Sequence, residues 1–218
     1  MMRKSRILSA LVVFGLLGLS SPALWAADAV ASTQKAPQDS PKASIETLDQ
    51  ALLQTMQAGK AAGYAGRYKI IAPVLAKVYD FEKIAQLALG SEWSKLSVAE
   101  QKQFVSVLAK YTAATYAGRF DGYDGEHFAI VDTQELRPGT MGVFTTFTMK
   151  SGRVHRFDYL LEQSANKEWR VINVVADGVS DLSLKRAEYV DLLKSKGFPA
   201  LIAHLRRQIQ DYASGAKS

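Results

Sequence analysis

Residues 141–175 read MGVFTTFTMKSGRVHRFDYLLEQSANKEWRVINVV, and the alternation of apolar and polar residues in this stretch decides the fold class. A period of two is typical of strands with one buried face. The breaks at Ser151-Gly152 and at residues 164–167 are too short for crossovers, so neighbouring strands must run antiparallel. The predicted meander has four strands: Phe128–Thr133, Met141–Lys150, Val154–Gln163 and Trp169–Val175.

Helical patterns flank the meander on both sides. Apolar residues recur there at three- and four-residue steps, and Ser97 with Glu100 supplies a capping box for the longest run. The predicted helices are residues 44–56, Arg67–Val78 with Pro73 near its first turn or at a kink, Phe81–Leu89, residues 98–118, Leu182–Lys194 and Pro199–Tyr212. This order predicts an α+β fold, a four-stranded twisted antiparallel sheet with helices packed on one face.

Composition limits the function classes. The chain has 218 residues, 48% of them hydrophobic, which is enough for the core of one domain. Cysteine is absent, which excludes disulfides, thiolate nucleophiles, cysteine-ligated zinc and an acyl-cysteine anchor. The formal net charge is +6, and it falls to +3 without Arg3, Lys4 and Arg6. A balance this mild argues against nucleic acid as a partner.

The first residues have the composition of a targeting segment. Met1–Arg6 is basic, Ile7–Leu19 is apolar, and small residues follow up to Ala26. An apolar run this short does not span about 30 Å of hydrocarbon, so we predict a cleaved signal peptide over residues 1–26 and export to the periplasm. Cleavage after Ala29 also fits. We expect a flexible leader at 27–43, a single domain at 44–212 and a disordered tail at 213–218.

The search for catalytic chemistry is mostly negative. The three histidines, His127, His155 and His204, fall in separate predicted elements and lack metal-ligand spacing. No nucleophile elbow, P-loop or dinucleotide-binding motif is present. We therefore predict no enzyme activity, no catalytic residue, no metal and no cofactor. An enzyme that uses Asp158 or His155 is the competing hypothesis.

Two stretches resemble one exported family. Residues 81–97, FEKIAQLALGSEWSKLS, and residues 169–180, WRVINVVADGVS, are similar in order and content to the toluene-tolerance, or MlaC-type, periplasmic lipid-binding proteins. The resemblance covers roughly residues 45–210. After Ser180 the chain departs from the phospholipid carriers and is more similar to the hopanoid-associated HpnM branch, which leaves the cargo open.

The resemblance implies a carrier without catalysis, and we expect it to be a monomer, although the sequence does not fix the oligomeric state. The carrier would bind a phospholipid or a hopanoid in an apolar slot between sheet and helices and move it between the inner and outer membranes. Transport of this kind is associated with the lipid asymmetry of the outer membrane. The implied partners are an inner-membrane transporter complex and an outer-membrane lipoprotein complex. The alternative is a non-catalytic periplasmic adaptor of a membrane transport complex, with a filled core and no lipid of its own.

Periodicity, not the family, selects the candidate lipid-binding residues. They are the apolar side chains that face inward from the predicted sheet and from the helices opposite it. Any one of them is also consistent with packed core. The candidates are Val143, Phe147, Phe157, Tyr159 and Val171 in the sheet, and Val74, Val78, Phe104, Leu108 and Tyr111 in the helices.

Overall fold

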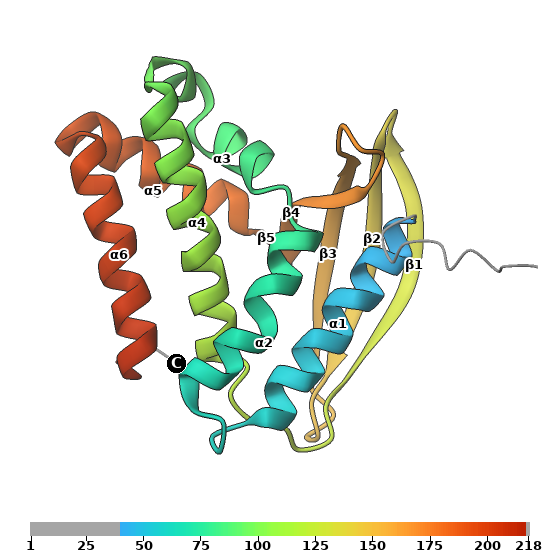
Figure 1. Cartoon of the computed structure of the whole chain (residues 1–218). Helices are drawn as coiled ribbons and strands as arrows, with labels where there is room; N and C mark the ends of the chain where they lie inside the picture. Colours follow the sequence, from blue (N-terminus) through green and yellow to red (C-terminus); the bar gives the residue numbers. More distant parts are fainter. Residues whose placement is uncertain (1–39, 217–218) are drawn as a thin grey trace, which may run out of the picture. The chain divides into compact units, whose positions relative to one another are not determined.

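The computed structural model of the protein describes residues 40–216, which contain six α-helices, one 3-10 helix and a five-stranded sheet (Figure 1). The predicted signal peptide and most of the predicted leader lie outside the described residues. In chain order the elements are α1 (Pro41–Ala58), α2 (Gly63–Val78), α3 (Phe81–Leu89), η1 (Gly90–Lys95), α4 (Val98–Arg119), β1 (His127–Arg137), β2 (Thr140–Thr148), β3 (Val154–Gln163), β4 (Trp169–Ala176), β5 (Val179–Ser180), α5 (Asp181–Lys196) and α6 (Phe198–Ser214).

Side-chain caps explain where several helices begin. Ser40 accepts a hydrogen bond from the Ala43 N–H, and Pro41 occupies the first turn, so α1 starts before the predicted position at Ser44. Ser97 and Glu100 form the predicted capping box of α4. Helix α2 begins at Gly63 and not at Arg67, so Pro73 lies in the helix interior, not near its first turn. The last helix continues to Ser214, into the segment predicted as a disordered tail.

The sheet is the predicted antiparallel meander, with strand order β1-β2-β3-β4-β5. Strands β2 and β3 match their predicted ranges closely, and Val143 is paired with Tyr159 across them. Strand β1 continues to Arg137, well beyond the predicted end at Thr133. The fifth strand, Val179–Ser180, is a two-residue addition that pairs with the end of β4.

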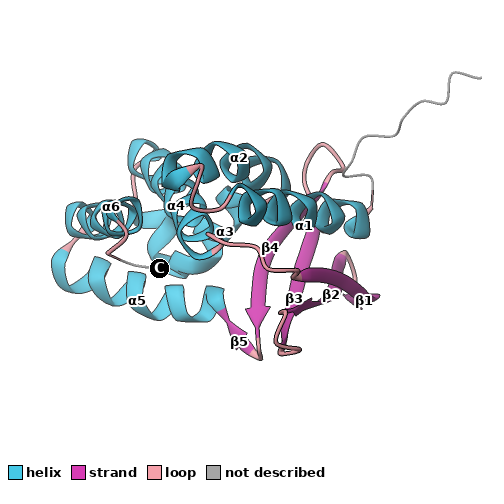
Figure 2. Cartoon of the chain, turned by 90° about the horizontal axis from the view of Figure 1, so that it is seen from below, coloured by secondary structure: helices cyan, strands magenta, loops and turns pink. Residues whose placement is uncertain are grey.

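The helices cover one face of the sheet, as predicted (Figures 1 and 2). Helix α1 packs on β1, β2 and β4, while α2, α3 and α5 contact β4, and α4 and α6 pack behind them. The side chains between the layers are fully buried, among them Leu48 of α1 and Leu161 of β3. On the other face Val131 and Val154 are exposed. The hydrophobic core therefore begins between the sheet and the helices and continues through the helical layer as far as α6.

Candidate functional site

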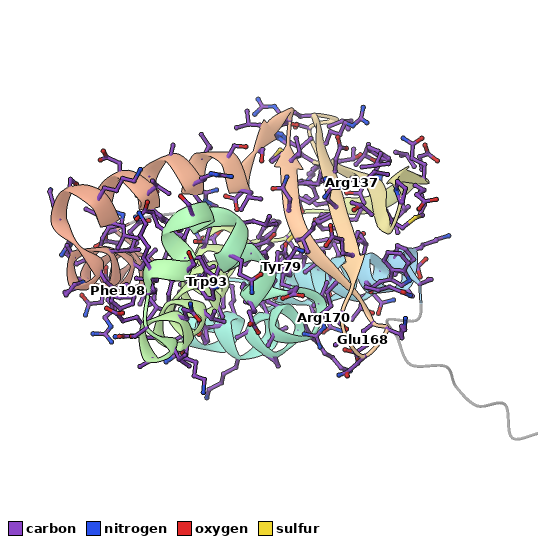
Figure 3. The ribbon with its side chains drawn as sticks, turned by 90° about the horizontal axis from the view of Figure 1, so that it is seen from above. Tyr79, Trp93, Arg137, Glu168, Arg170 and Phe198 are labelled. Atoms are coloured by element: carbon purple, nitrogen blue, oxygen red, sulfur yellow. The ribbon has the colours of Figure 1, made fainter. Side chains whose placement is uncertain are left out.

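A cavity of about 230 Å³ lies between the sheet and the helices. Every layer of the fold contributes to its wall, so the cavity forms only when helices and sheet are packed together. The lining residues are Leu52, Tyr79, Ile84, Leu108, Thr112, Thr115, Tyr116, Arg119, Phe120, Phe128, Phe157, Tyr159, Val174, Ala176, Asp181 and Lys185. Figure 3 shows Tyr79 in the space between the helices and the strands.

One face of α4 forms the longest continuous wall. Residues 108, 112, 115, 116 and 119 line the cavity, and their spacing of three and four places them on a single helix face. Two of them are threonines whose hydroxyls donate to their own helix, to the carbonyl oxygens of Leu108 and Tyr111. Because these hydroxyls already have hydrogen-bond partners in their own helix, the two threonines contribute short and largely apolar side chains to the wall.

A second, wider hollow of about 600 Å³ adjoins the cavity. The two share Arg119, Phe120 and Phe157 as lining residues, and the wider one is also lined by Met56 and Phe147. We call it the mouth. Because the same side chains line both spaces, the mouth and the cavity are adjacent, which makes the mouth the candidate entrance from solvent.

Aromatic rings cluster where the mouth meets the cavity. The rings of Phe128 and Phe147 lie 4.7 Å apart between centroids, and Phe120 contacts Phe147 edge-on at 6.2 Å. Phe157 lies 6.5 Å from Phe147. These four residues, which we call the aromatic gate, come from the end of α4 and from β1, β2 and β3. Rings in such arrangements attract one another, and they present apolar surface to anything that passes.

Two tyrosines form the main polar contact inside the cavity. The hydroxyl oxygens of Tyr79 and Tyr116 lie 2.6 Å apart, and either hydroxyl can be the donor. Burial raises the pKa of Tyr116 to about 12, and it also raises the pKa of Tyr79. Both phenols are therefore neutral at ordinary pH, and the middle of the cavity carries no charge.

Charged groups lie at the edges of the cavity. Arg119 belongs to both the cavity and the mouth, and Asp181 forms an ion pair with Lys185 at the start of α5. At the mouth, His155 Nδ1 lies 2.8 Å from a carboxylate oxygen of Asp177. The arrangement is an apolar chamber with ionic groups at its rim, which suits a ligand with a hydrocarbon body and a polar end.

The structure brings four of the ten predicted site residues to this site. Leu108, Phe157 and Tyr159 line the cavity, and Phe147 lines the mouth. The other six are not among the lining residues of either space. Val78, Phe104, Val143 and Val171 are fully buried in the core, while Val74 and Tyr111 are half-buried and pack against it. Contact of any of the ten with a ligand stays a prediction.

Periodicity missed several lining residues for identifiable reasons. Phe120 caps the end of α4 and Phe128 is the second residue of β1, so both flank a loop whose path no repeat predicts. Tyr79 lies between α2 and α3, where its backbone forms an isolated bridge to Val171. Tyr116 was detectable, because it lies eight residues after Leu108 on the same face of α4.

Two of the three histidines, His155 and His204, and also Asp158 have structural partners. Asp158 accepts a hydrogen bond from the Arg156 side chain at 2.8 Å, and His204 lies 2.6 Å from Glu188. His155 pairs with Asp177, so His155 and Asp158 do not form a dyad. Within residues 40–216 no group of three or more histidine or acidic side chains is arranged to hold a metal ion.

No helix in the part of the chain that the structure describes is long and apolar enough to cross a membrane.

Comparisons with known proteins identify a family by sequence and a solved structure of similar fold. The family described as MlaC protein matches residues 46–207 of this chain. Among solved structures, the phospholipid-binding protein from Ralstonia solanacearum, determined in complex with a phospholipid, has a similar fold. The TM-score is 0.69, with 19% sequence identity, and the match covers 79% of this chain and 98% of that chain.

Proposed function

The chain belongs to the MlaC family, and from that premise we propose that it is a lipid carrier that holds the hydrocarbon part of its cargo in the cavity between sheet and helices. The observation that supports the proposal is the cavity itself. A core without a ligand-binding role would be closed by side chains, whereas here the wall of α4 stands away from Phe157 and Tyr159.

Burial of hydrocarbon provides the binding energy. Each methylene removed from water contributes about 0.8 kcal/mol, so about ten methylenes inside the protein contribute about 8 kcal/mol. The aromatic gate and the methyl groups of Thr112 and Thr115 offer the necessary apolar contacts. No covalent step is needed, which is why we propose a binding protein and not an enzyme.

We propose a phospholipid as the cargo class. The Ralstonia solanacearum protein with the same fold was determined with a phospholipid bound, which supports this class over a hopanoid. Arg119 at the rim also fits the phosphate of such a lipid, whereas Lys185 is paired there with Asp181. Residues 182–198, which resemble the hopanoid-associated branch, lie mainly in α5, whose cavity-lining residues are Asp181 and Lys185.

The proposed setting is the periplasm, reached by way of the signal peptide predicted in residues 1–26. There the monomeric carrier would exchange lipid with an inner-membrane transporter complex and an outer-membrane lipoprotein complex. Transport between the two membranes is proposed on the family premise alone.

Native mass spectrometry of gently purified protein tests the proposal. We expect one lipid per protein, with a mass that distinguishes phospholipid from hopanoid. Replacing Ala176 with tryptophan puts an indole into the cavity wall and is expected to abolish the adduct. Val174→Phe is a milder filling variant that we expect to retain less lipid than the parent.

The matched control is Val131→Trp, on the exposed face of β1 at 60% exposure. It adds an indole far from the cavity and is expected to keep the adduct. A folded Ala176→Trp protein with full lipid content would refute the proposed site. A parent protein that carries no lipid would favour the adaptor hypothesis.

A further inference from the structure

Three helices of this protein carry a marked excess of positive charge. Helices α2, α4 and α6 together hold eight Lys or Arg residues and two acidic residues. The other described residues hold fourteen basic and seventeen acidic side chains. The three helices pack on one another with α4 between α2 and α6 (Figure 1). Arg67 of this set is buried and Arg119 lines the cavity, but the other six basic side chains are exposed, so the modest net charge of the chain conceals a basic surface on these three helices.

A groove between α4 and α6 concentrates this charge. It has a volume of about 360 Å³ and is separate from the cavity and the mouth. Lys110 and Arg206 line it from opposite helices, together with Gln103, Ser106 and Gln210 and the apolar side chains of Val107 and Ile209. Lysine, arginine, glutamine and serine all supply hydrogen-bond donors, and no acidic residue lines the groove. The polar part of its lining suits anionic oxygen atoms.

The basic side chains are available to a partner. Lys102, Lys110, Arg206 and Arg207 are exposed, and none of them forms an ion pair with an acidic side chain of residues 40–216. Lys102 and Lys110 lie eight residues apart on the exposed face of α4 that also carries Ser106. The positive charge is thus presented in rows and is not neutralised within the protein.

The surroundings favour a membrane surface over a protein partner. Stable protein interfaces have an apolar centre with aromatic or aliphatic anchors. The large exposed hydrophobic side chains of the described residues include none on α2 or α6, and on α4 only Val98 at its start. Basic rows without an apolar anchor are what a bilayer containing anionic lipid attracts.

We infer that the groove between α4 and α6, with Lys110 and Arg206 at its centre, docks the protein on bilayers that contain anionic phospholipid. Lys110 and Arg119, which lines the mouth, are nine residues apart on α4, about 14 Å along the helix axis and about half a turn around it, so the groove and the mouth lie on opposite sides of α4.

Co-sedimentation with vesicles tests this inference directly. The probes are phosphatidylcholine vesicles with and without about 30% phosphatidylglycerol, at about 0.05 M and about 0.3 M salt. We expect binding only to the anionic vesicles, and weaker binding at the higher salt concentration. Each basic residue near such a surface is worth about fivefold in affinity, so Lys102→Gln/Lys110→Gln/Arg206→Gln is expected to bind about a hundredfold more weakly.

The matched control removes the same charge elsewhere, as Lys42→Gln/Arg153→Gln/Lys167→Gln in α1 and the β-hairpin turns. We expect this control to lose less than about tenfold. Equal losses for the two triple variants would overturn the inference, as would absence of binding to anionic vesicles by the parent protein. Native mass spectrometry of the groove variant measures lipid content separately, so failure of docking is distinguishable from failure of the proposed carrier function.

Discussion

Replacing Asp49 with asparagine probes a buried, unpaired carboxyl group next to the cavity. Asp49 lies on the inner face of α1, one turn before the cavity-lining Leu52, and is 8% exposed. Its Oδ1 atom has no hydrogen-bond partner within the described residues. Its negative charge disfavours ionisation of Tyr116 of α4 and of Tyr159 of β3, so both phenols lie within its electrostatic reach.

The environment of this carboxyl makes stability depend on pH. Burial, with a smaller contribution from Glu46, raises the pKa of Asp49 from 3.8 to about 7. The native state then keeps its proton up to about pH 7, whereas the unfolded chain releases it near pH 4. Between these values the native state binds more protons, so the free energy of unfolding falls as pH rises. A shift of about three pKa units corresponds to at most about 4 kcal/mol.

Urea unfolding at about pH 5 and about pH 8 measures this effect. We expect the parent protein to lose about 2–3 kcal/mol more between the two pH values than Asp49→Asn does, because the carboxyl of the unfolded chain is already largely ionised at about pH 5. The amide costs about 1–3 kcal/mol at either pH, because its own N–H groups lack a partner, but that cost does not vary with pH. Asp132→Asn on exposed β1 is the control and should leave the pH dependence as in the parent.

Parallel pH curves for the parent and Asp49→Asn would refute the reasoning. They would mean that the carboxyl is hydrated or paired in solution, so that its ionisation has no consequence for folding. A variant that is less stable than the parent at about pH 5 but loses nothing with rising pH would agree with it.

Two further substitutions test packing around the site. Gly118→Ala is expected to lower the free energy of unfolding, measured in urea, by about 1–3 kcal/mol. The reason is that a Cβ at this position would lie 2.5 Å from the Tyr212 ring, where α4 meets α6. Unchanged stability would show that the two helices can separate freely. Phe120→Ala removes one ring of the aromatic gate and is expected to speed release of a fluorescent phospholipid to acceptor vesicles about tenfold or more, whereas unchanged release would place the entrance elsewhere.

The strand bounds could be predicted from the sequence where one face of the sheet is buried and the other is exposed to solvent. Strands β2 and β3 alternate along their length, and their bounds differ from the predicted ones by at most two residues. Strand β1 is exposed from Val131 to Arg137, so its second half has no apolar period to detect. It is a strand because it pairs with β2, and that tertiary pairing leaves no mark on the local sequence.

The sequence predicted which face of the sheet points toward the site, but not which residues of that face line the cavity. Alternation places both Val143 and Tyr159 on the face toward the helices, and both are fully buried. Only Tyr159 lines the cavity. The difference depends on which helix residue lies opposite and how long its side chain is, and this depends on the crossing of α1 and α4 over the sheet, not on any repeat within one element.

Whether the space between sheet and helices is filled or stays open as the cavity depends largely on the side chains of α4. Between Leu108 and Tyr116, the positions of α4 that face the sheet are Thr112 and Thr115. A leucine at either position would extend into the space, gain apolar contacts and close it. Threonine is shorter, and its hydroxyl is satisfied by its own helix, so the wall is apolar without filling the gap. A carrier must keep space for cargo without exposing unsatisfied polar groups, and short side chains that bond back to their own helix meet both needs.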